Sequence, residues 1–545
     1  MTTPASRVDA VVVGAGFAGL YTMYRFRRLG LHVQAFEAAS DVGGTWWWNR
    51  YPGARCDIQS VDYSYSFDPD LDQEWTWSER YATQPEILRY ASHVADRFDL
   101  RRDVQFDTRV DAATWLEDEQ RWVVETDRGD EVRARFLVMA TGCLSTTKRV
   151  DIDGLETFAG TVLHTGRWPH EPVDLTGQRV GVIGTGSSAI QAVPLLAEQA
   201  AHLTVFQRTP AYSMPAQNAA LSDEHVAAMK AAYPEHRVAA RHTHGGVVAA
   251  PRPDSPASAA APAEREAKYA VAWEQGTLHA LLGCYNDLLL DSASNETVAE
   301  FIRDRIRSIV DDPATAEKLA PRSYPFGTKR PCLDTNYYAT YNQPNVTLVD
   351  VRTTPIVGVE PGGVRTSDGF HDLDTLVLAT GFDAMTGPLL GPLITGRDGR
   401  TLREAWADGP VTYLGLAVAG FPNLFTITGP GSPSVLTNMM VSIEQHVEWI
   451  SDCVAYLDAH DRSTIEATAE AQDAWTAHVA EVAEYTLMPR ANSWYMGANV
   501  PGKPRVFMAY IAGHGTYRDI CDGVAADGYR GFALSPSDVE AAAVQ

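Results

Sequence analysis

Two glycine-rich turns stand far apart in this chain of 545 residues. The first contains Gly14, Gly16 and Gly19, and the second contains Gly184 and Gly186, with Ala189 at its third position. In such a turn the first glycine permits a tight bend and the second lets the backbone approach a pyrophosphate. The pyrophosphate then rests on the N-terminus of the following helix. Two such turns predict two dinucleotides, with electrons passing from one to the other.

Each turn lies between a predicted strand and a predicted helix. Apolar runs at residues 8–13 and 180–183 lead into the turns and predict buried parallel strands. Helical spacing follows at 20–29 and 190–197, and Pro194 predicts a kink in the second helix. Further apolar strands are predicted at 31–36, 136–139, 203–206 and 376–378. The pattern predicts an α/β protein with two Rossmann-like dinucleotide-binding domains.

The residues that end the next strands distinguish the two sites. Glu37 follows the first unit, and a carboxylate there accepts hydrogen bonds from ribose hydroxyls. Arg208 occupies the corresponding place in the second unit, where no acid is present, so a 2′-phosphate and hence NADP is favoured over NAD. A solvated surface arginine is the alternative for Arg208. The further candidates at the second site are Ser187, Ser188, Thr209 and Lys329.

Between the two turns, residues 158–169 match the pattern FxGxxxHxxxWP at every fixed position: Phe158, Gly160, His164, Trp168 and Pro169. This segment resembles the fingerprint of the Baeyer–Villiger monooxygenases, a family of FAD- and NADPH-dependent enzymes. Further blocks at 50–57, 327–331, 379–383, 429–439 and 492–499 resemble the same family, in particular its phenylacetone and steroid monooxygenases. The resemblance implies a conformational role for the fingerprint; a structural role is the alternative for His164.

The resemblance implies the cofactors and the reaction. Gly44-Thr45-Trp46, after a first glycine at position 43, is typical of FAD-binding monooxygenases and implies FAD at the first turn, with NADPH at the second. It implies that NADPH delivers hydride to FAD and that O2 adds to the flavin C4a carbon. The C4a-peroxyflavin anion would then attack a ketone and give an ester or lactone, and sulfoxidation is expected as well.

The same resemblance implies roles for residues outside the glycine turns. Arg330 matches the family's catalytic arginine, whose guanidinium stays charged and can stabilise an anion. Asp57 matches the carboxylate that positions this arginine and is also counted among the cofactor-binding residues; a surface ion pair and a turn residue are the alternatives. Trp494 is expected to hold NADP or to shape the substrate site, with a core tryptophan as the alternative. The expected ketone pocket consists of Ser434, Val435, Leu436 and Met439.

The motifs divide the chain into discontinuous domains. We expect an FAD domain at 1–145 and 385–545, an NADP domain at 146–215 and 325–384, and a helical insertion at 216–324. Within the insertion, residues 242–265 are rich in Ala, Pro and Ser and predict a mobile loop. Asn295 is a candidate cap for a helix over 298–309, and residues 443–457 form an amphipathic pattern. The tail after Leu534 is expected to fray.

The composition excludes several classes. A formal charge of −24 argues against nucleic acid or an anionic membrane as a partner. Six scattered cysteines show neither metal-ligand spacing nor the Cys pair of a disulfide reductase, so we expect no metal and a reducing cytoplasm. The residues that follow Met1 do not resemble a signal peptide, and we expect none; the sequence also has no apolar stretch of about twenty residues. The expected partners are a small ketone and O2, and the expected state is a monomer or weak oligomer.

Two other functions remain open from the sequence. An N- or S-oxidising flavin monooxygenase shares both turns but usually has a linker without the Trp168-Pro169 ending. A catalytically idle nucleotide-binding sensor would not need Arg330 or Asp57. A ketone assay with ester detection separates the first alternative from Baeyer–Villiger chemistry.

Overall fold

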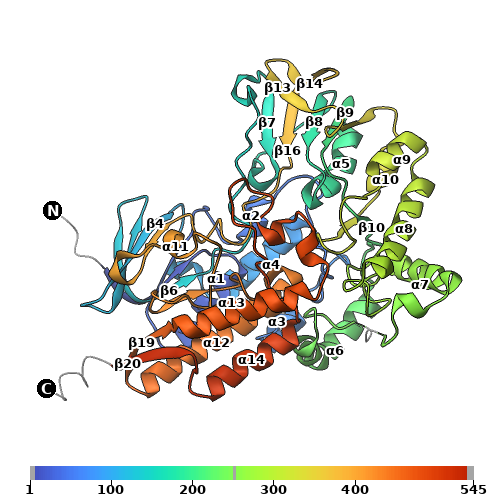
Figure 1. Cartoon of the computed structure of the whole chain (residues 1–545). Coiled ribbons are helices and arrows are strands. Elements are labelled where there is room, and N and C mark those ends of the chain that lie inside the picture. Colours follow the sequence, from blue (N-terminus) through green and yellow to red (C-terminus); the bar gives the residue numbers. More distant parts are fainter. Residues whose placement is uncertain (1–5, 250–252, 537–545) are drawn as a thin grey trace.

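The computed structural model describes residues 6–249 and 253–536. The chain forms two sheet-containing lobes with helices beside and below them (Figure 1). The first sheet has eight strands in the order β17-β4-β5-β6-β1-β2-β3, with β18 beside β6. Its strands are β1 (Ser6–Val13), β2 (Val33–Phe36), β3 (Val104–Gln105), β4 (Val110–Leu116), β5 (Arg121–Thr126), β6 (Glu131–Met139), β17 (Leu393–Thr395) and β18 (Leu424–Thr426).

The centre of this sheet is parallel and buried on both faces. β1 pairs in parallel with β2 and β6, with Val12 opposite both Ala35 and Val138. Val11 packs with one apolar cluster and Val12 with another, which is why β1 is an unbroken apolar run rather than an alternating one. β1 ends at Val13, immediately before the first glycine turn, and α1 (Phe17–Arg28) begins within that turn.

The second sheet has five strands, all parallel, in the order β12-β9-β8-β16-β7. The strands are β7 (Thr161–His164), β8 (Arg179–Ile183), β9 (His202–Gln207), β12 (Val346–Asp350) and β16 (Thr375–Leu378). Along β16, Val377 packs with the cluster that includes α5 (Ser187–Gln199), whereas Leu376 and Leu378 pack with a three-stranded meander. The meander consists of β13 (Ile356–Glu360), β14 (Gly363–Thr366) and β15 (Gly369–Asp372).

The remaining helices surround the junction of the lobes. The first lobe contributes α2 (Thr45–Trp48), α3 (Pro69–Glu74), α4 (Gln84–Arg97) and α11 (Leu402–Ala405). Between β10 (Ser213–Pro215) and β11 (Cys332–Asp334) lie α6 (Asp223–His242), α7 (Pro262–Gln275), α8 (Ser292–Ile309) and α9 (Pro313–Leu319), on the right of Figure 1. After β11 come α10 (Tyr337–Thr340), α12 (Met439–Ala459), α13 (Ala469–Glu484), α14 (His514–Ala526) and the pair β19 (Arg462–Ala467) and β20 (Phe532–Pro536).

Several local predictions need correction. The irregular segment is shorter than the predicted 242–265, because α6 extends to His242 and α7 begins at Pro262; residues 250–252 lie outside the described residues. Asp291, rather than Asn295, caps α8 by accepting from the Ser294 amide at 2.8 Å. Asn295 is the fourth residue of α8, and its side chain binds the backbone of Leu288 and Phe326. The predicted fraying after Leu534 falls largely outside the described residues.

Pro194 does not interrupt α5, which continues from Ser187 to Gln199.

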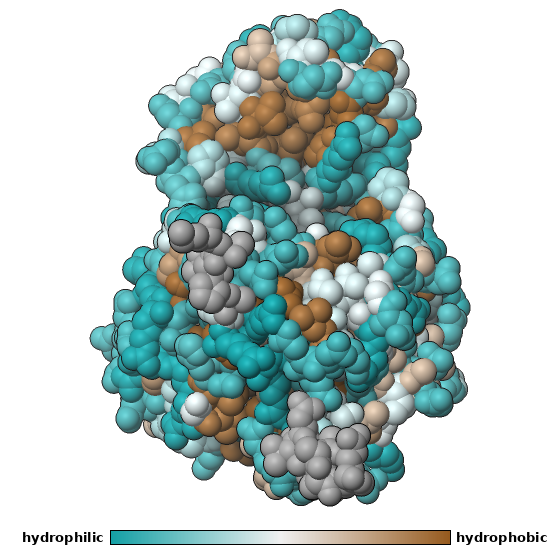
Figure 2. Space-filling view, turned by 90° about the vertical axis from the view of Figure 1, so that its left-hand side faces the viewer, coloured by the Kyte–Doolittle hydropathy of each residue, from teal (hydrophilic) through white to brown (hydrophobic). Residues whose placement is uncertain are grey.

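Figure 2 shows a waist between the two lobes and a broad apolar area on the upper one, built around the second sheet. No described helix combines the length and apolarity that crossing a bilayer demands.

Candidate active site

Arg330 and Asp57 form a bidentate ion pair. The guanidinium donates from Nε to Asp57 Oδ2 at 2.9 Å and from Nη2 to Asp57 Oδ1 at 2.7 Å. Burial disfavours the charged guanidinium, but Asp57 more than offsets this, and the net pKa of Arg330 rises above its usual value. The side chains keep 25% and 20% of their surface exposed. The cation is therefore fixed in direction and remains charged while it faces open space.

The same arginine contacts the predicted substrate loop. Its Nη1 donates to the Val435 carbonyl at 2.8 Å. Val435 belongs to a short 3-10 helix, Ser434–Leu436, that precedes α12. Ser434 is fully buried at φ 43°, and its hydroxyl donates to the Thr428 carbonyl at 3.1 Å. Leu436 and Met439 pack against the same apolar cluster as Val435. The structure thus brings Arg330, Asp57 and the four predicted pocket residues together.

The first glycine turn is a closed backbone cradle. Gly14 has φ 107°, and a Cβ there would lie 2.7 Å from the Ala140 carbonyl oxygen. A Cβ on Gly19 would lie 1.9 Å from the Gly14 oxygen, so only glycine lets α1 pack on the turn. Gly16 and Gly44 face one another, because a Cβ on Gly44 would lie 2.9 Å from the Gly16 Cα. The turn and the Gly44-Thr45-Trp46 segment are therefore parts of one site.

Glu37 stabilises the first glycine turn through hydrogen bonds to the backbone. Its carboxylate accepts from the Ala15 amide at 2.7 Å and from the Ala39 amide at 2.8 Å. Burial raises the pKa of Glu37, and the backbone amides oppose that shift. α1 begins without a side-chain cap and without an acid in its first turn, so its amides are available to an anion. These features fit the pyrophosphate and ribose of FAD. Trp46 is buried and donates to the Tyr63 hydroxyl at 3.2 Å, whereas Thr45 is exposed.

The second glycine turn has the same backbone but an open front. Gly184 has φ 118°, and a Cβ there would lie 2.3 Å from the Ala379 oxygen. A Cβ on Gly186 would meet nothing within 4 Å. α5 again starts without a side-chain cap or an acid in its first turn. The Ser187 hydroxyl lies 3.1 Å from the Cys332 sulfur, and Ser188 is partly exposed. This arrangement fits a second pyrophosphate.

Three cations without an acidic partner gather beside the second turn. The pKa of Lys329 and that of Lys148 are both lowered, first by burial and then by the charge of Arg208. No ion pair among the described residues includes any of the three. The Thr209 carbonyl accepts from the Thr185 hydroxyl at 2.8 Å, which ties the strand end to the turn. Like charges held together suit a phosphate, so the cluster fits the 2′-phosphate of NADP.

Lys148 was missed by the sequence analysis. It lies outside every motif, and no local pattern marks it; only the fold brings it to Arg208. Tyr495 was also not predicted, because in its block only Trp494 was assigned a role; the two ring centroids lie 4.2 Å apart. Burial raises the pKa of Tyr495 to about 12, against the lowering effect of the nearby Arg330. Trp494 is partly buried in the same cluster as Val435 and Met439.

The fingerprint forms an edge strand and its exit. Phe158 and Trp168 are buried and Pro169 is exposed, while a Cβ on Gly160 would lie 2.2 Å from the Asp374 oxygen. His164 ends β7; its Nδ1 accepts from the Gly166 amide at 3.0 Å, and burial lowers its pKa. Directly after Pro169, His170 lies 2.9 Å from Arg50 and packs on Trp47 at 4.5 Å between ring centroids. The segment therefore runs from the second sheet onto the first lobe.

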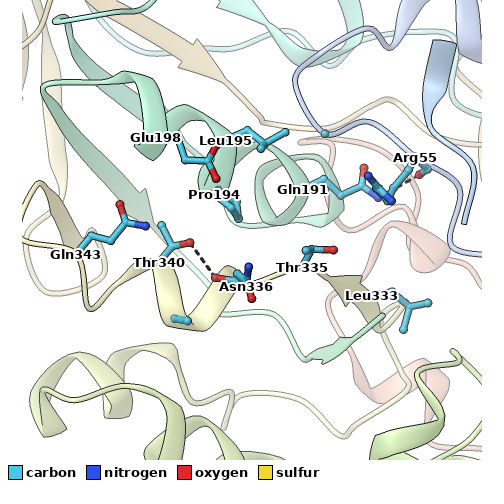
Figure 3. Close-up of a pocket in the computed structure, with 12 residues that line it drawn as sticks. Arg55, Gln191, Pro194, Leu195, Glu198, Leu333, Thr335, Asn336, Thr340 and Gln343 are labelled. Carbon is cyan, nitrogen blue, oxygen red and sulfur yellow. Dashed lines mark hydrogen bonds between the residues drawn. The ribbon is translucent and has the colours of Figure 1, made fainter. Parts of the chain in front are cut away.

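A cavity of about 280 Å³ lies beside α5 (Figure 3), and neither Arg330 nor Asp57 lines it. Loop 53–55 of the first lobe forms one wall, and α5 and the β11–α10 segment form the others. It is therefore a gap between the lobes rather than the ketone pocket. Among the described residues, no group of three His, Cys, Asp or Glu side chains is arranged to hold a metal ion.

Comparisons with known proteins agree with this geometry. A family model described as pyridine nucleotide-disulphide oxidoreductase matches residues 11–243. The Baeyer–Villiger monooxygenase of Pseudooceanicola batsensis is 44% identical over 97% of this chain and 96% of its own length. The phenazine N-monooxygenase of Lysobacter antibioticus is 42% identical over 96% of this chain and 97% of its own length. All six cysteines of the present chain are buried and unpaired.

Solved structures match over the full length. An oxidised steroid monooxygenase bound to NADP is 55% identical, with a TM-score of 0.93, and the match covers 98% of this chain and 100% of that one. The OTEMO complex with FAD and NADP is 40% identical, with a TM-score of 0.94, and covers 97% and 100%. The fold and the site thus define a flavoprotein monooxygenase with FAD and NADP domains of Rossmann type, as predicted. The chain belongs to the Baeyer–Villiger monooxygenase family.

Proposed function

We propose that the chain inserts one oxygen atom of O2 beside the carbonyl of a ketone. The balanced reaction converts ketone, NADPH, H+ and O2 into ester or lactone, NADP+ and H2O. The observation that carries the proposal is the Arg330–Asp57 pair, which lies in contact with the apolar loop 434–436 and close to the second dinucleotide turn. FAD, when bound at the first turn, supplies the hydride acceptor and the O2 activation.

Arg330 holds the positive charge of the reaction. Three of its N–H groups are used, two by Asp57 and one by Val435. A guanidinium has five, so about two remain for the oxygen atoms that become negative during attack on the carbonyl. Because Arg330 cannot lose its proton, it stabilises those oxygens without donating one. Asp57 fixes the plane of the guanidinium and limits the cost of its burial.

The remaining predicted residues have binding roles in this proposal. The amides at Gly16 and the start of α1 bind the FAD pyrophosphate, and Glu37 and the Gly44–Trp46 segment enclose it. Gly14 shapes the turn, because its own amide donates to the Phe36 carbonyl. Gly186, Ser187 and Ser188 bind the NADP pyrophosphate, and Arg208, Thr209, Lys329 and Lys148 bind its 2′-phosphate. The Ser493 hydroxyl and Asn499 Oδ1 are buried without a partner among the described residues, so the segment around Trp494 offers polar groups to a bound cofactor.

The pocket loop favours apolar substrates. Val435, Leu436 and Met439 offer carbon surface beside a single cation, which suits a ketone and also an organic sulfide. We therefore include sulfoxidation in the proposal. Incubation of the FAD-loaded protein with NADPH, 18O2 and a panel of cyclic, aryl and steroid ketones tests it. One 18O atom in the ester supports the proposal, and NADPH oxidation that no ketone stimulates contradicts it.

N-oxidation is the second candidate, favoured by the 42% identity to a phenazine N-monooxygenase. Phenazine and a ketone in direct competition distinguish the two: ester without N-oxide supports the first proposal. We further propose the domain boundaries given above and a cytoplasmic enzyme that acts as a monomer or weak oligomer. Six unpaired thiols support the reducing compartment.

A further inference from the structure

Gln191 joins α5 to the loop that carries Asp57. The Tyr51 hydroxyl donates to Gln191 Oε1 at 2.7 Å, and Gln191 Nε2 donates to the Arg55 carbonyl at 3.1 Å. Both ends of the amide are therefore used by the same loop. Figure 3 shows Gln191 reaching from α5 toward Arg55 at the edge of the cavity.

The loop also rests on the helix backbone at this residue. Gly53 has φ 83°, and a Cβ there would lie 2.3 Å from the Gln191 carbonyl oxygen. Only glycine allows this approach, so loop 51–57 and α5 touch at side chain and backbone together. The cavity of about 280 Å³ borders both Gln191 and Arg55, so the junction has open space on one side. On that side the two parts are held by the Gln191 hydrogen bonds and by the backbone contact of Gly53.

The two ends of this junction are functional. Gln191 lies one helical turn after Ser187 and Ser188, at the N-terminus where α5 faces the second dinucleotide. Asp57 lies two residues beyond Arg55 and holds Arg330 by two hydrogen bonds. The Ser188 hydroxyl also lowers the pKa of Tyr51, which burial raises to about 12, so Tyr51 lies near both the helix start and Gln191. A short contact path therefore runs from the dinucleotide turn to Arg330.

We propose that Gln191 is a positioning residue that couples the dinucleotide bound at α5 to the placement of Asp57, and through Asp57 to that of Arg330. The inference rests on the proposed function. When the dinucleotide holds α5, Gln191 holds loop 51–57 and the guanidinium is aimed at the reacting oxygens. When the dinucleotide leaves, the loop loses that restraint. The coupling is reciprocal, so loss of Gln191 also weakens dinucleotide binding.

Hydrogen exchange tests the coupling without turnover. In the FAD-loaded protein, saturating NADP+ is expected to slow amide exchange in residues 51–57, including the Cys56 amide that donates to Ala82. In Gln191→Leu, which removes both hydrogen bonds, this protection is expected to fall by at least about fivefold, the factor that a single hydrogen bond of ordinary net strength supports. Gln199→Leu, on an exposed residue of the same helix, is the matched control and retains full protection. Full protection in Gln191→Leu overturns the proposal.

Gln191→Glu provides a second variant if the leucine variant folds poorly. It keeps the acceptor for the Tyr51 hydroxyl and loses the donor to Arg55, so an intermediate protection is expected. If the leucine variant does not fold, protection in Gln191→Glu equal to that of the parent contradicts the coupling.

Product partition tests the consequence for chemistry. At saturating NADPH, Gln191→Leu is expected to reduce FAD at the parent rate but to divert NADPH, H+ and O2 to NADP+ and H2O2, with kcat for ester lowered about fivefold and the ketone KM unchanged. An unchanged ratio of ester to H2O2 contradicts the proposal. If the parent forms no ester from any ketone, the proposed function fails, while the exchange experiment still decides the coupling.

Discussion

The two glycine turns share a backbone and differ in what surrounds it. At the first turn, Gly16 and Gly44 press against one another and a buried carboxylate, Glu37, binds the Ala15 amide. At the second, Gly186 and Ser187 are exposed and a Cβ on Gly186 would meet open space. Arg208, Lys148 and Lys329 replace the acid there.

This difference matches the different work of the two cofactors. The proposed reaction consumes one NADPH for each ester, so that dinucleotide must enter and leave in every turnover. FAD is regenerated in place and gains nothing from leaving. A closed cradle suits the resident cofactor and an open, cationic one suits the exchanged cofactor. The strand–turn–helix unit is thus common to both sites, and the exchange rate is set by the neighbours.

Gly19→Ala is expected to have the largest effect, because its Cβ would lie 1.9 Å from the Gly14 oxygen. The first cradle cannot close, and soluble protein with FAD absorbance should be lost. Ala189→Gly at the matching position of the second turn is the control and should cost about 1 kcal/mol of helix stability with normal FAD content. Normal FAD content in Gly19→Ala would show that the first turn is as tolerant as the second.

Arg330→Ala separates both turns from the chemistry between them. The variant should bind FAD and be reduced by NADPH, because neither turn is altered, whereas ester formation should fall by about a thousandfold, at the upper end of what removal of one oxyanion donor costs. Stopped-flow reduction and ester detection measure the two halves. Ester at the parent rate would remove Arg330 from the mechanism.

Arg208→Ala combined with Lys329→Ala tests the cationic side of the second turn. The KM for NADPH should rise about a hundredfold, as expected for two charge-assisted hydrogen bonds, while the KM for NADH stays constant. Arg322→Ala, an exposed arginine paired with Glu317, is the control. Equal losses with both dinucleotides would mean that the cluster does not bind a 2′-phosphate.

Asp334→Asn should have the smallest effect on activity. It tests a buried carboxyl group on the side of the second site, as Glu37 is the buried carboxyl group at the first turn. Burial raises the pKa of Asp334 in β11 to about 6, from 3.8. Because the folded protein keeps this proton longer than the unfolded chain, its contribution to stability is present below about pH 4 and is lost as pH rises through about 6. The loss is at most about 3 kcal/mol.

Unfolding measured between pH 4 and 7.5 should therefore show a steeper decline for the parent than for Asp334→Asn, with unchanged turnover at pH 7.5. Parallel pH profiles would show that Asp334 titrates normally in the folded protein.

Local sequence was sufficient for the parts of the fold that are themselves local. Glycine at positive φ, an apolar parallel strand and a helix start make Gly14 and Gly184 recognisable without a structure. The joining of Arg330 to Asp57 was expected only through the family resemblance, since 273 positions separate them. The contact of Arg330 with Val435, and the effect of the Arg208 charge on Lys148, depend on how separate parts of the chain pack, which no short pattern encodes.

Residue composition and residue type gave the wrong bounds for one loop and the wrong cap for one helix. Ala, Pro and Ser between 242 and 265 predicted a loop as far as residue 265, yet Pro262 already begins α7, where proline is favoured because its missing N–H costs no helical bond. Asn295 suggested a cap because its amide accepts hydrogen bonds, but Asp291 lies four residues earlier and occupies that place.

The burial of all six cysteines has a consequence for durability. The uncoupled reaction proposed above would release H2O2 beside the protein, and thiolates are the form that peroxide attacks. Burial raises the pKa of Cys332, 3.1 Å from Ser187, to about 12, so its sulfur stays protonated at neutral pH. Burial of the six thiols thereby protects them from oxidation by the peroxide that uncoupled turnover would release.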